Sequence, residues 1–236
     1  MSRITVQFNF FGPFLKKEEI EKILDPKVSN LAYQHQRDLF KWFFELPFNS
    51  LSKEVIERYA EITTEESHCN IVPHTKEIFE RLLKPLKSAK KNYCLSDYST
   101  TIALCGTVGE MLAILLWKIN EVRLKNNLIT EQDEKGLFGE SIEKLGQDRR
   151  LKILKTFGQI TEKQYQEFID VKNSRKPYLH LWSADLSSEK DDALKVFKKT
   201  FKLFKDITGI GLADARSVKI NPLMLKLFKD IKINKF

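Results

Sequence analysis

The sequence is poor in the residues that interrupt regular structure, because its 236 residues include only 9 glycines and 7 prolines. So few turn residues argue against a turn-rich β-sandwich and against long flexible linkers. Cysteine is also scarce, and three residues do not suggest a disulfide framework. We therefore expect a mostly helical chain in a reducing, cytoplasmic setting.

Long uninterrupted hydrophobic runs are missing as well. The most apolar stretch, residues 101–117, contains Glu110 and falls short of the roughly 20 residues that cross a bilayer. The N-terminal residues lack a basic segment followed by an apolar run and a cleavage site, so we expect no signal peptide. These absences predict a core helix at residues 101–117 and no membrane partner.

Positive charge is present in excess. The chain has 40 Lys and Arg residues against 32 Asp and Glu residues, a net charge of +8. Its 42% apolar content is sufficient for a folded core in one large domain or two small ones. The excess positive charge favours a polyanionic partner.

The first 91 residues are predicted to form an N-terminal, mostly helical subdomain. Residues 3–11 alternate as a strand does, and Gly12-Pro13 ends the run. Hydrophobic spacing and N-cap residues predict three helices, with a kink or break at Pro85 in the last. These helices cover residues 31–46, 52–62 and 74–91.

Residues 92–212 have longer and more regular patterns. The apolar residues between 97 and 126 recur every three or four positions, which is typical of one buried helical stripe. Four long amphipathic helices with short connections predict an antiparallel four-helix bundle. They are expected at residues 97–126, 135–157, 161–174 and 187–209, followed by an extension at 213–236 with a short helix at 222–230.

Chemistry-bearing residues gather between the third and fourth long helices. Pro177 disfavours helical geometry at the preceding residue, so we expect the third helix to end or bend sharply near Arg175. Such a break would bring Arg175 and His180 together, although they point in different directions on an unbroken helix. The pair is predicted to form a small cationic pocket, or alternatively to cap a helix end and a turn.

An Arg followed after four residues by a His, between the last two of four helices, resembles the HEPN superfamily (higher eukaryote and prokaryote nucleotide-binding domain). The resemblance covers about residues 95–210. In that family the residue after the Arg is often Asn, whereas Lys176 stands here. The resemblance implies a homodimer whose two Arg/His pairs face each other, and in many members a metal-independent endoribonuclease without a cofactor.

On this resemblance Arg175 and His180 are the catalytic residues. Imidazole exchanges protons near neutral pH, and the Arg donors suit the charged oxygens of a phosphate. The expected products are a 2′,3′-cyclic phosphate and a 5′-hydroxyl end. The resemblance extends to toxin and phage-defence nucleases, which implies a cognate antitoxin or regulatory protein as a further partner.

Several other residues are candidates for RNA binding. Asn173 and Lys176 are placed to contact phosphate, and Tyr178 either packs or stacks on a base. The lysines of the last long helix, Lys198 and Lys202 among them, track phosphates or form an ordinary solvated face.

Glu110 is the candidate partner of the Arg/His pair. A carboxylate that points inward from an apolar helix needs a hydrogen-bond or charge partner, and Arg175 or His180 can supply it. Two other functions remain open beside the nuclease. One is a non-catalytic module that binds a nucleotide, RNA or protein through the same pocket, and the other is a structural dimerisation scaffold.

The remaining motifs favour structural roles. The spacing of His68, Cys69, His74 and Cys94 matches no common zinc pattern, so no metal site is predicted. The glycines are not spaced as a phosphate-binding loop and are expected to allow close helix packing. They are Gly106, Gly109, Gly136 and Gly139.

Overall fold

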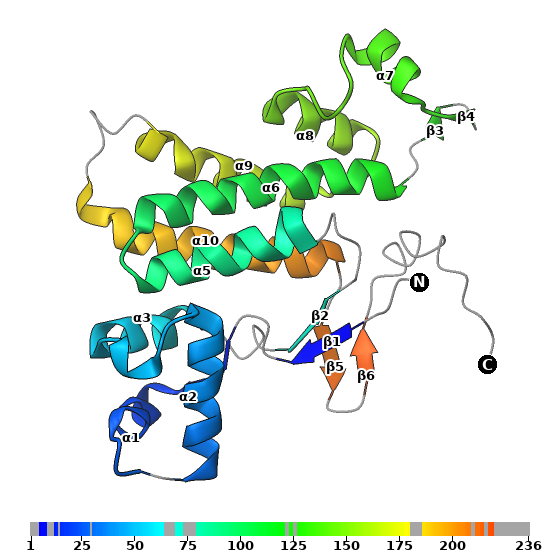
Figure 1. Cartoon of the computed structure of the whole chain (residues 1–236). Helices are drawn as coiled ribbons and strands as arrows, with labels where there is room; N and C mark the ends of the chain where they lie inside the picture. Colours follow the sequence, from blue (N-terminus) through cyan, green and yellow to red (C-terminus); the bar gives the residue numbers. More distant parts are fainter. Residues whose placement is uncertain are drawn as a thin grey trace, which may run out of the picture.

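The chain is mostly helical, as the composition predicts (Figure 1). A computed structural model describes residues 5–8, 12–13, 15–28, 30–63, 69–72, 79–120, 123–124, 127–179, 186–208, 211–214 and 217–219. Within them the buried apolar side chains form one continuous cluster that runs from Leu15 to Ile207. The N-terminal helices and the later helices therefore share a core.

The N-terminal part combines a small sheet with three α-helices. Strand β1 (Thr5–Phe8) pairs antiparallel with β2 (Cys69–Val72), so the strand predicted at residues 3–11 is confirmed over its centre. Strand β2 was not predicted. The helical segments are η1 (Lys17–Glu19), α1 (Ile20–Leu24), α2 (Leu31–Phe44), η2 (Phe48–Ser50) and α3 (Lys53–Ile62).

Helix α2 begins where its sequence predicts and ends two residues early, at Phe44 rather than at residue 46. The Asn30 side chain accepts a hydrogen bond from the Ala32 amide at 2.9 Å, which satisfies a free donor of the first turn. Phe40, Phe43 and Phe44 are buried around the ring of Tyr59 from α3. The helix stops where Glu45 adopts the left-handed conformation, with φ at 59°.

Near Pro85, where a kink or a break is predicted, the helix type changes and the chain stays helical. A π-helical turn, η4 (Phe79–Leu83), leads into α5 (Lys84–Cys94), and Pro85 lies in the first turn of α5. A proline is tolerated there because the first turn has no amide to pair within the helix. The predicted domain boundary at residue 91 falls inside α5, which packs on α3 and on the helices that follow.

Helix α6 (Tyr98–Asn120) is the central helix of the larger part. Ile102, Cys105, Val108 and Leu112 of the predicted stripe are fully buried. By length and composition α6 could cross a membrane, but 61% of its apolar window is buried inside the protein. It is the core helix that the sequence predicts, although the chain leaves the helix after Asn120 and forms a short hairpin, β3 (Arg123–Leu124) with β4 (Asn127–Leu128).

The single helix predicted at residues 135–157 is wrong, since two helices occupy this region. Helix α7 (Glu131–Phe138) ends at Gly139, whose φ of 79° is accessible to glycine without strain. Helix α8 (Gln147–Thr156) starts only after an irregular loop. Apolar residues on both sides of the loop have a helical period, but the loop itself is not helical.

Helices α9 (Glu162–Leu179) and α10 (Glu189–Thr208) complete the helical layers, and α5, α6, α9 and α10 lie side by side (Figure 1). The expected end of the third helix near Arg175 is wrong, because α9 continues through Pro177 to Leu179. Pro177 lacks the amide that would bond to the Asn173 carbonyl, and Asn173 is exposed to water there.

Smaller features differ from the prediction in detail. A 3₁₀ turn, η6 (Leu186–Ser188), precedes α10, and the Ser188 hydroxyl lies 3.2 Å from the Asp192 carboxylate. A final hairpin joins β5 (Gly211–Asp214) to β6 (Ser217–Lys219). The helix predicted at residues 222–230 lies outside the described residues.

Candidate functional site

Arg175 lies on the side of α9 that faces α6, and its side chain meets Glu110. The guanidinium Nη2 donates to the carboxylate Oε1 of Glu110 in a close ion pair. Both side chains are partly buried, with 25% of Arg175 and 29% of Glu110 exposed. The contact suggested for Glu110 is therefore present. Within the described part of the chain, the Arg175 side chain makes no other hydrogen bond, so donors of its planar fork remain for a ligand.

Gly106, one turn before Glu110 on α6, makes room for Arg175. A Cβ at this position would lie 2.8 Å from Cδ of Arg175, which is closer than real side chains approach. Gly109 has a similar role, because its Cβ would lie 3.2 Å from Val171. The close-packing role predicted for the glycines is confirmed for these two. It is wrong for Gly136 and Gly139, where a Cβ would meet nothing within 4 Å.

Arg150 on α8 is a buried cation that the sequence analysis missed. It is 4% exposed, and its guanidinium donates to the carbonyls of Ile142 at 3.0 Å and Leu145 at 2.7 Å. Burial lowers its pKa, whereas the negative charge of Glu110 acts in the opposite direction. The signal was available, since Arg150 precedes Leu151 on the apolar face of α8.

His180 lies outside the described residues, as does Trp182. The convergence of Arg175 and His180 therefore stays a prediction. The described helix brings the chain to Leu179, one residue short of His180, and α10 starts at Glu189.

Tyr178 is not exposed for stacking on a base. Its side chain is buried, with 8% of the residue exposed, and its hydroxyl donates to Asp192 of α10 at 2.7 Å. Burial and the hydrogen bond to the Asp192 carboxylate raise its pKa. Tyr178 thus connects α9 to α10. Its prediction as an RNA-binding residue is wrong, and the alternative role in packing is confirmed. Asn173 and Lys176 are exposed on α9.

The lysines of α10 are partly neutralised by carboxylates of α9. Lys202 pairs with Glu167 at 2.7 Å, and Lys199 forms an ion pair with Asp170. Lys198 is exposed and forms no ion pair with a described carboxylate. The lysine face exists as predicted, but much of its charge is already matched within the protein.

Metal and thiol chemistry find little support in the described residues. No group of three or more His, Cys, Asp or Glu side chains there is arranged to hold a metal ion, and His68 and His74 lie outside them. Cys94 and Cys105 are fully buried, and burial raises the pKa of each thiol to about 12. Such thiols are poor nucleophiles at neutral pH.

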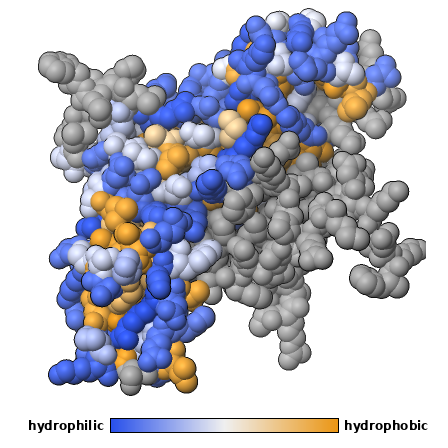
Figure 2. All heavy atoms as spheres, viewed as in Figure 1, coloured by the Kyte–Doolittle hydropathy of each residue, from blue (hydrophilic) through white to orange (hydrophobic). Residues whose placement is uncertain are grey.

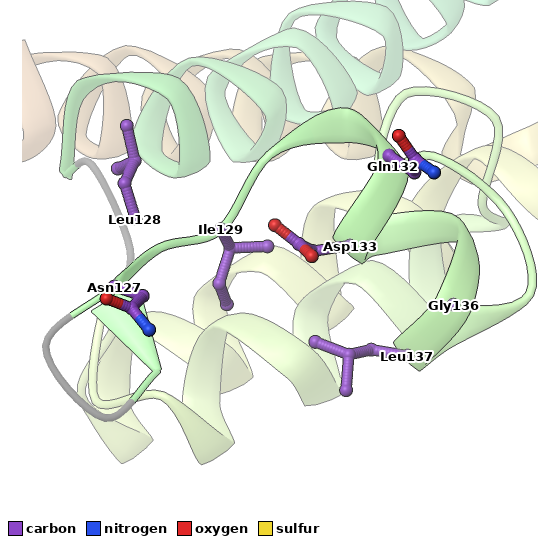
Figure 3. A pocket seen from close by; sticks show the side chains of 7 residues that line it. All are labelled: Asn127, Leu128, Ile129, Gln132, Asp133, Gly136 and Leu137. Atoms are coloured by element: carbon purple, nitrogen blue, oxygen red, sulfur yellow. The ribbon is translucent and has the colours of Figure 1, made fainter.

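A surface pocket of about 420 Å³ lies between the β3–β4 hairpin and α7 (Figure 3). Its apolar walls include Leu128 and Leu137, each 50% exposed. Its carboxylate, Asp133, is engaged with the amide and hydroxyl of Thr130 at the start of α7. The pocket contains none of the predicted site residues.

Comparison of the chain with protein-family models, curated proteins and solved structures found no match.

Proposed function

We propose that the chain is a HEPN-like endoribonuclease that acts as a cytoplasmic homodimer without a metal or another cofactor. The observation that carries the proposal is the setting of Arg175, whose guanidinium is held by Glu110 and seated over Gly106, five residues before His180. In this proposal residues 92–212 are the bundle, with α6, α8, α9 and α10 as its four helices, and residues 1–91 form an accessory subdomain.

The proposed chemistry divides between two histidines. His180 of one subunit takes the proton from an RNA 2′-hydroxyl, and the 2′-oxygen then attacks phosphorus. The bond to the 5′-oxygen breaks, and His180 of the second subunit donates the proton that the leaving oxygen needs. Arg175 holds the non-bridging oxygens while negative charge builds on them. The Glu110 contact fixes the guanidinium and leaves donors for this purpose.

The test is cleavage of single-stranded RNA in EDTA by purified protein. We expect the wild type to leave 2′,3′-cyclic phosphate ends, which mass spectrometry identifies, and His180→Ala to lower the rate by about 100-fold or more. His35 is an exposed histidine on α2, so His35→Ala is the matched control and should keep full activity. If wild type and His180→Ala are equally inert on every RNA, the nuclease proposal fails.

The Glu110 ion pair also suits a second function, a non-catalytic module that binds a nucleotide, RNA or protein. Arg175 would then be a fixed anion-binding group with no proton transfer. Binding that survives His180→Ala but is lost in Arg175→Ala favours this module. Indifference to both substitutions favours a structural scaffold. For the nuclease, a toxin or phage-defence role with an antitoxin or regulatory protein remains part of the proposal.

A further inference from the structure

Positive charge is concentrated along α8 and the C-terminal half of α9. Residues 147–156 and 171–179 contain seven cations and a single carboxylate, Asp148. In contrast, α10 contains six lysines and four carboxylates. The cations of the first group are Arg149, Arg150, Lys152, Lys155, Lys172, Arg175 and Lys176.

These two segments belong to one face because Asp148 joins them. Its carboxylate forms a close ion pair with Lys172 of α9. This hydrogen bond holds the pKa of Asp148 below its usual value, and the charges of Lys176 and Lys152 act in the same direction. Lys172 thus neutralises Asp148, and the charges of Lys152 and Lys176 have no such partner among the described carboxylates. We call Lys152 and Lys176 the α8–α9 basic face.

Much of this charge remains available to a ligand. Lys152 and Lys176 are exposed, and neither forms an ion pair with a carboxylate in the described part of the chain. Lys155 is matched by Glu162 at 2.6 Å and is therefore left out of the face. The surface over α7 and α8 is largely hydrophilic, whereas hydrophobic side chains gather over the α1–α3 unit (Figure 2).

The face also lies beside the candidate site. Lys176 directly follows Arg175 on α9, so a phosphate chain that contacts Lys176 passes close to the partly exposed Arg175 side chain. On α10, Lys199 and Lys202 are paired with Asp170 and Glu167, and the exposed Lys195 and Lys198 share their helix with four carboxylates.

We infer that single-stranded RNA binds with its phosphates along the α8–α9 basic face rather than along the lysines of α10. The inference rests on the proposed ribonuclease function and adds the path of its substrate. Non-bridging phosphate oxygens are the acceptors that exposed lysines suit, and each contact releases counterions, which makes binding depend on salt.

The experiment measures binding of a fluorescein-labelled, 2′-O-methylated 20-nucleotide RNA by anisotropy over a series of NaCl concentrations. Methylation blocks cleavage, so binding is read independently of any nuclease activity. We expect Lys152→Gln/Lys176→Gln to reduce the slope of log affinity against log salt by about 1.4, which corresponds to two phosphate contacts on a single strand. The matched control, Lys195→Gln/Lys198→Gln, removes two exposed charges from α10 and should leave the slope unchanged.

Each outcome decides a separate point. Equal slopes for the two double variants, a loss confined to the α10 variant, or no RNA binding by the wild type would overturn the inference. So would equally tight binding of a polyglutamate peptide, because the face would then be a general polyanion surface. If the double variant reduces the slope but the wild type does not cleave unmodified RNA, the binding path is supported and the nuclease proposal is wrong. If the wild type cleaves RNA but the slope is unchanged, the nuclease proposal is supported and the binding path is wrong.

Discussion

A single missing side chain at position 106 determines where Arg175 can lie. Glycine inside a helix costs about 1 kcal/mol relative to alanine, so its presence in α6 needs a compensating contact. The compensation is the Arg175 side chain, whose Cδ lies 2.8 Å from where a Cβ of residue 106 would stand. From this position the Arg175 guanidinium forms its ion pair with Glu110.

Two glycines with different surroundings test this reasoning. Gly136→Ala in α7 should raise the free energy of unfolding by about 1 kcal/mol, since nothing lies within 4 Å of its Cβ. Gly106→Ala should gain nothing, because the methyl group displaces Arg175. In an Arg175→Ala background the gain should return. Urea unfolding measures all four variants, and an equal gain at both glycines in the wild-type background would contradict the proposed seat.

At the scale of elements, the loop between α7 and α8 is organised by Arg150. Besides Ile142 and Leu145, its guanidinium donates to the Glu143 carbonyl at 3.1 Å and to the Gln147 side chain at 2.7 Å. One side chain therefore holds several backbone carbonyls of a loop that has no regular structure of its own. Removing it would leave buried acceptors without partners.

Neighbouring arginines give a matched comparison. Arg150→Met should lower the free energy of unfolding by about 3 kcal/mol, because buried carbonyls lose their donors. Arg149→Met removes one exposed hydrogen bond, to the Phe138 carbonyl, and should cost less than about 1 kcal/mol. Chemical denaturation of the two variants decides the point, and similar losses would show that burial of Arg150 has no special weight.

This loop also marks the limit of what the sequence predicts. Helix α2 and the stripe of α6 follow from local spacing and capping, and the Glu110 contact follows from the need of a carboxylate in an apolar helix. The division between α7 and α8 depends instead on the buried guanidinium of Arg150, which donates hydrogen bonds to the carbonyls of Ile142 and Leu145 in the loop. Likewise, α9 continues through Pro177, which lies one turn after the exposed Asn173. Both depend on whether a residue is buried or exposed in the fold, although the residues involved are close in sequence.

At the scale of the whole molecule, a lysine is enclosed where the N-terminal helices meet the later ones. Lys90 of α5 is fully buried, and its Nζ lies 4.1 Å from the centre of the Tyr59 ring and 5.5 Å from that of Phe43. Burial lowers its pKa from 10.5 to about 7. The protonation of Lys90 is therefore linked to the packing of the N-terminal helices against the later helices.

This link predicts a dependence of stability on pH. Between about pH 7 and pH 10 the unfolded chain holds a proton on Lys90 that the folded protein has released, so the free energy of unfolding should rise with pH. The contribution is at most about 1.4 kcal/mol per pH unit. Urea unfolding at pH 7, 8 and 9 should show a steeper rise in the wild type than in Lys90→Met. Parallel curves would contradict the lowered pKa.

Helix α5 packs against both parts of the molecule and joins them. Its Leu86, Ala89 and Tyr93 are fully buried, and the Cys94 carbonyl at its end accepts a hydrogen bond from Arg58 of α3 at 2.7 Å. A recombination event that exchanged the first 91 codons would cut through this helix and combine halves that had never packed together. In genes that encode this fold, we therefore expect residues 1–91 and 92–212 to be inherited together. A substitution that packs against one side of α5 should be accompanied by a compensating substitution on the other side.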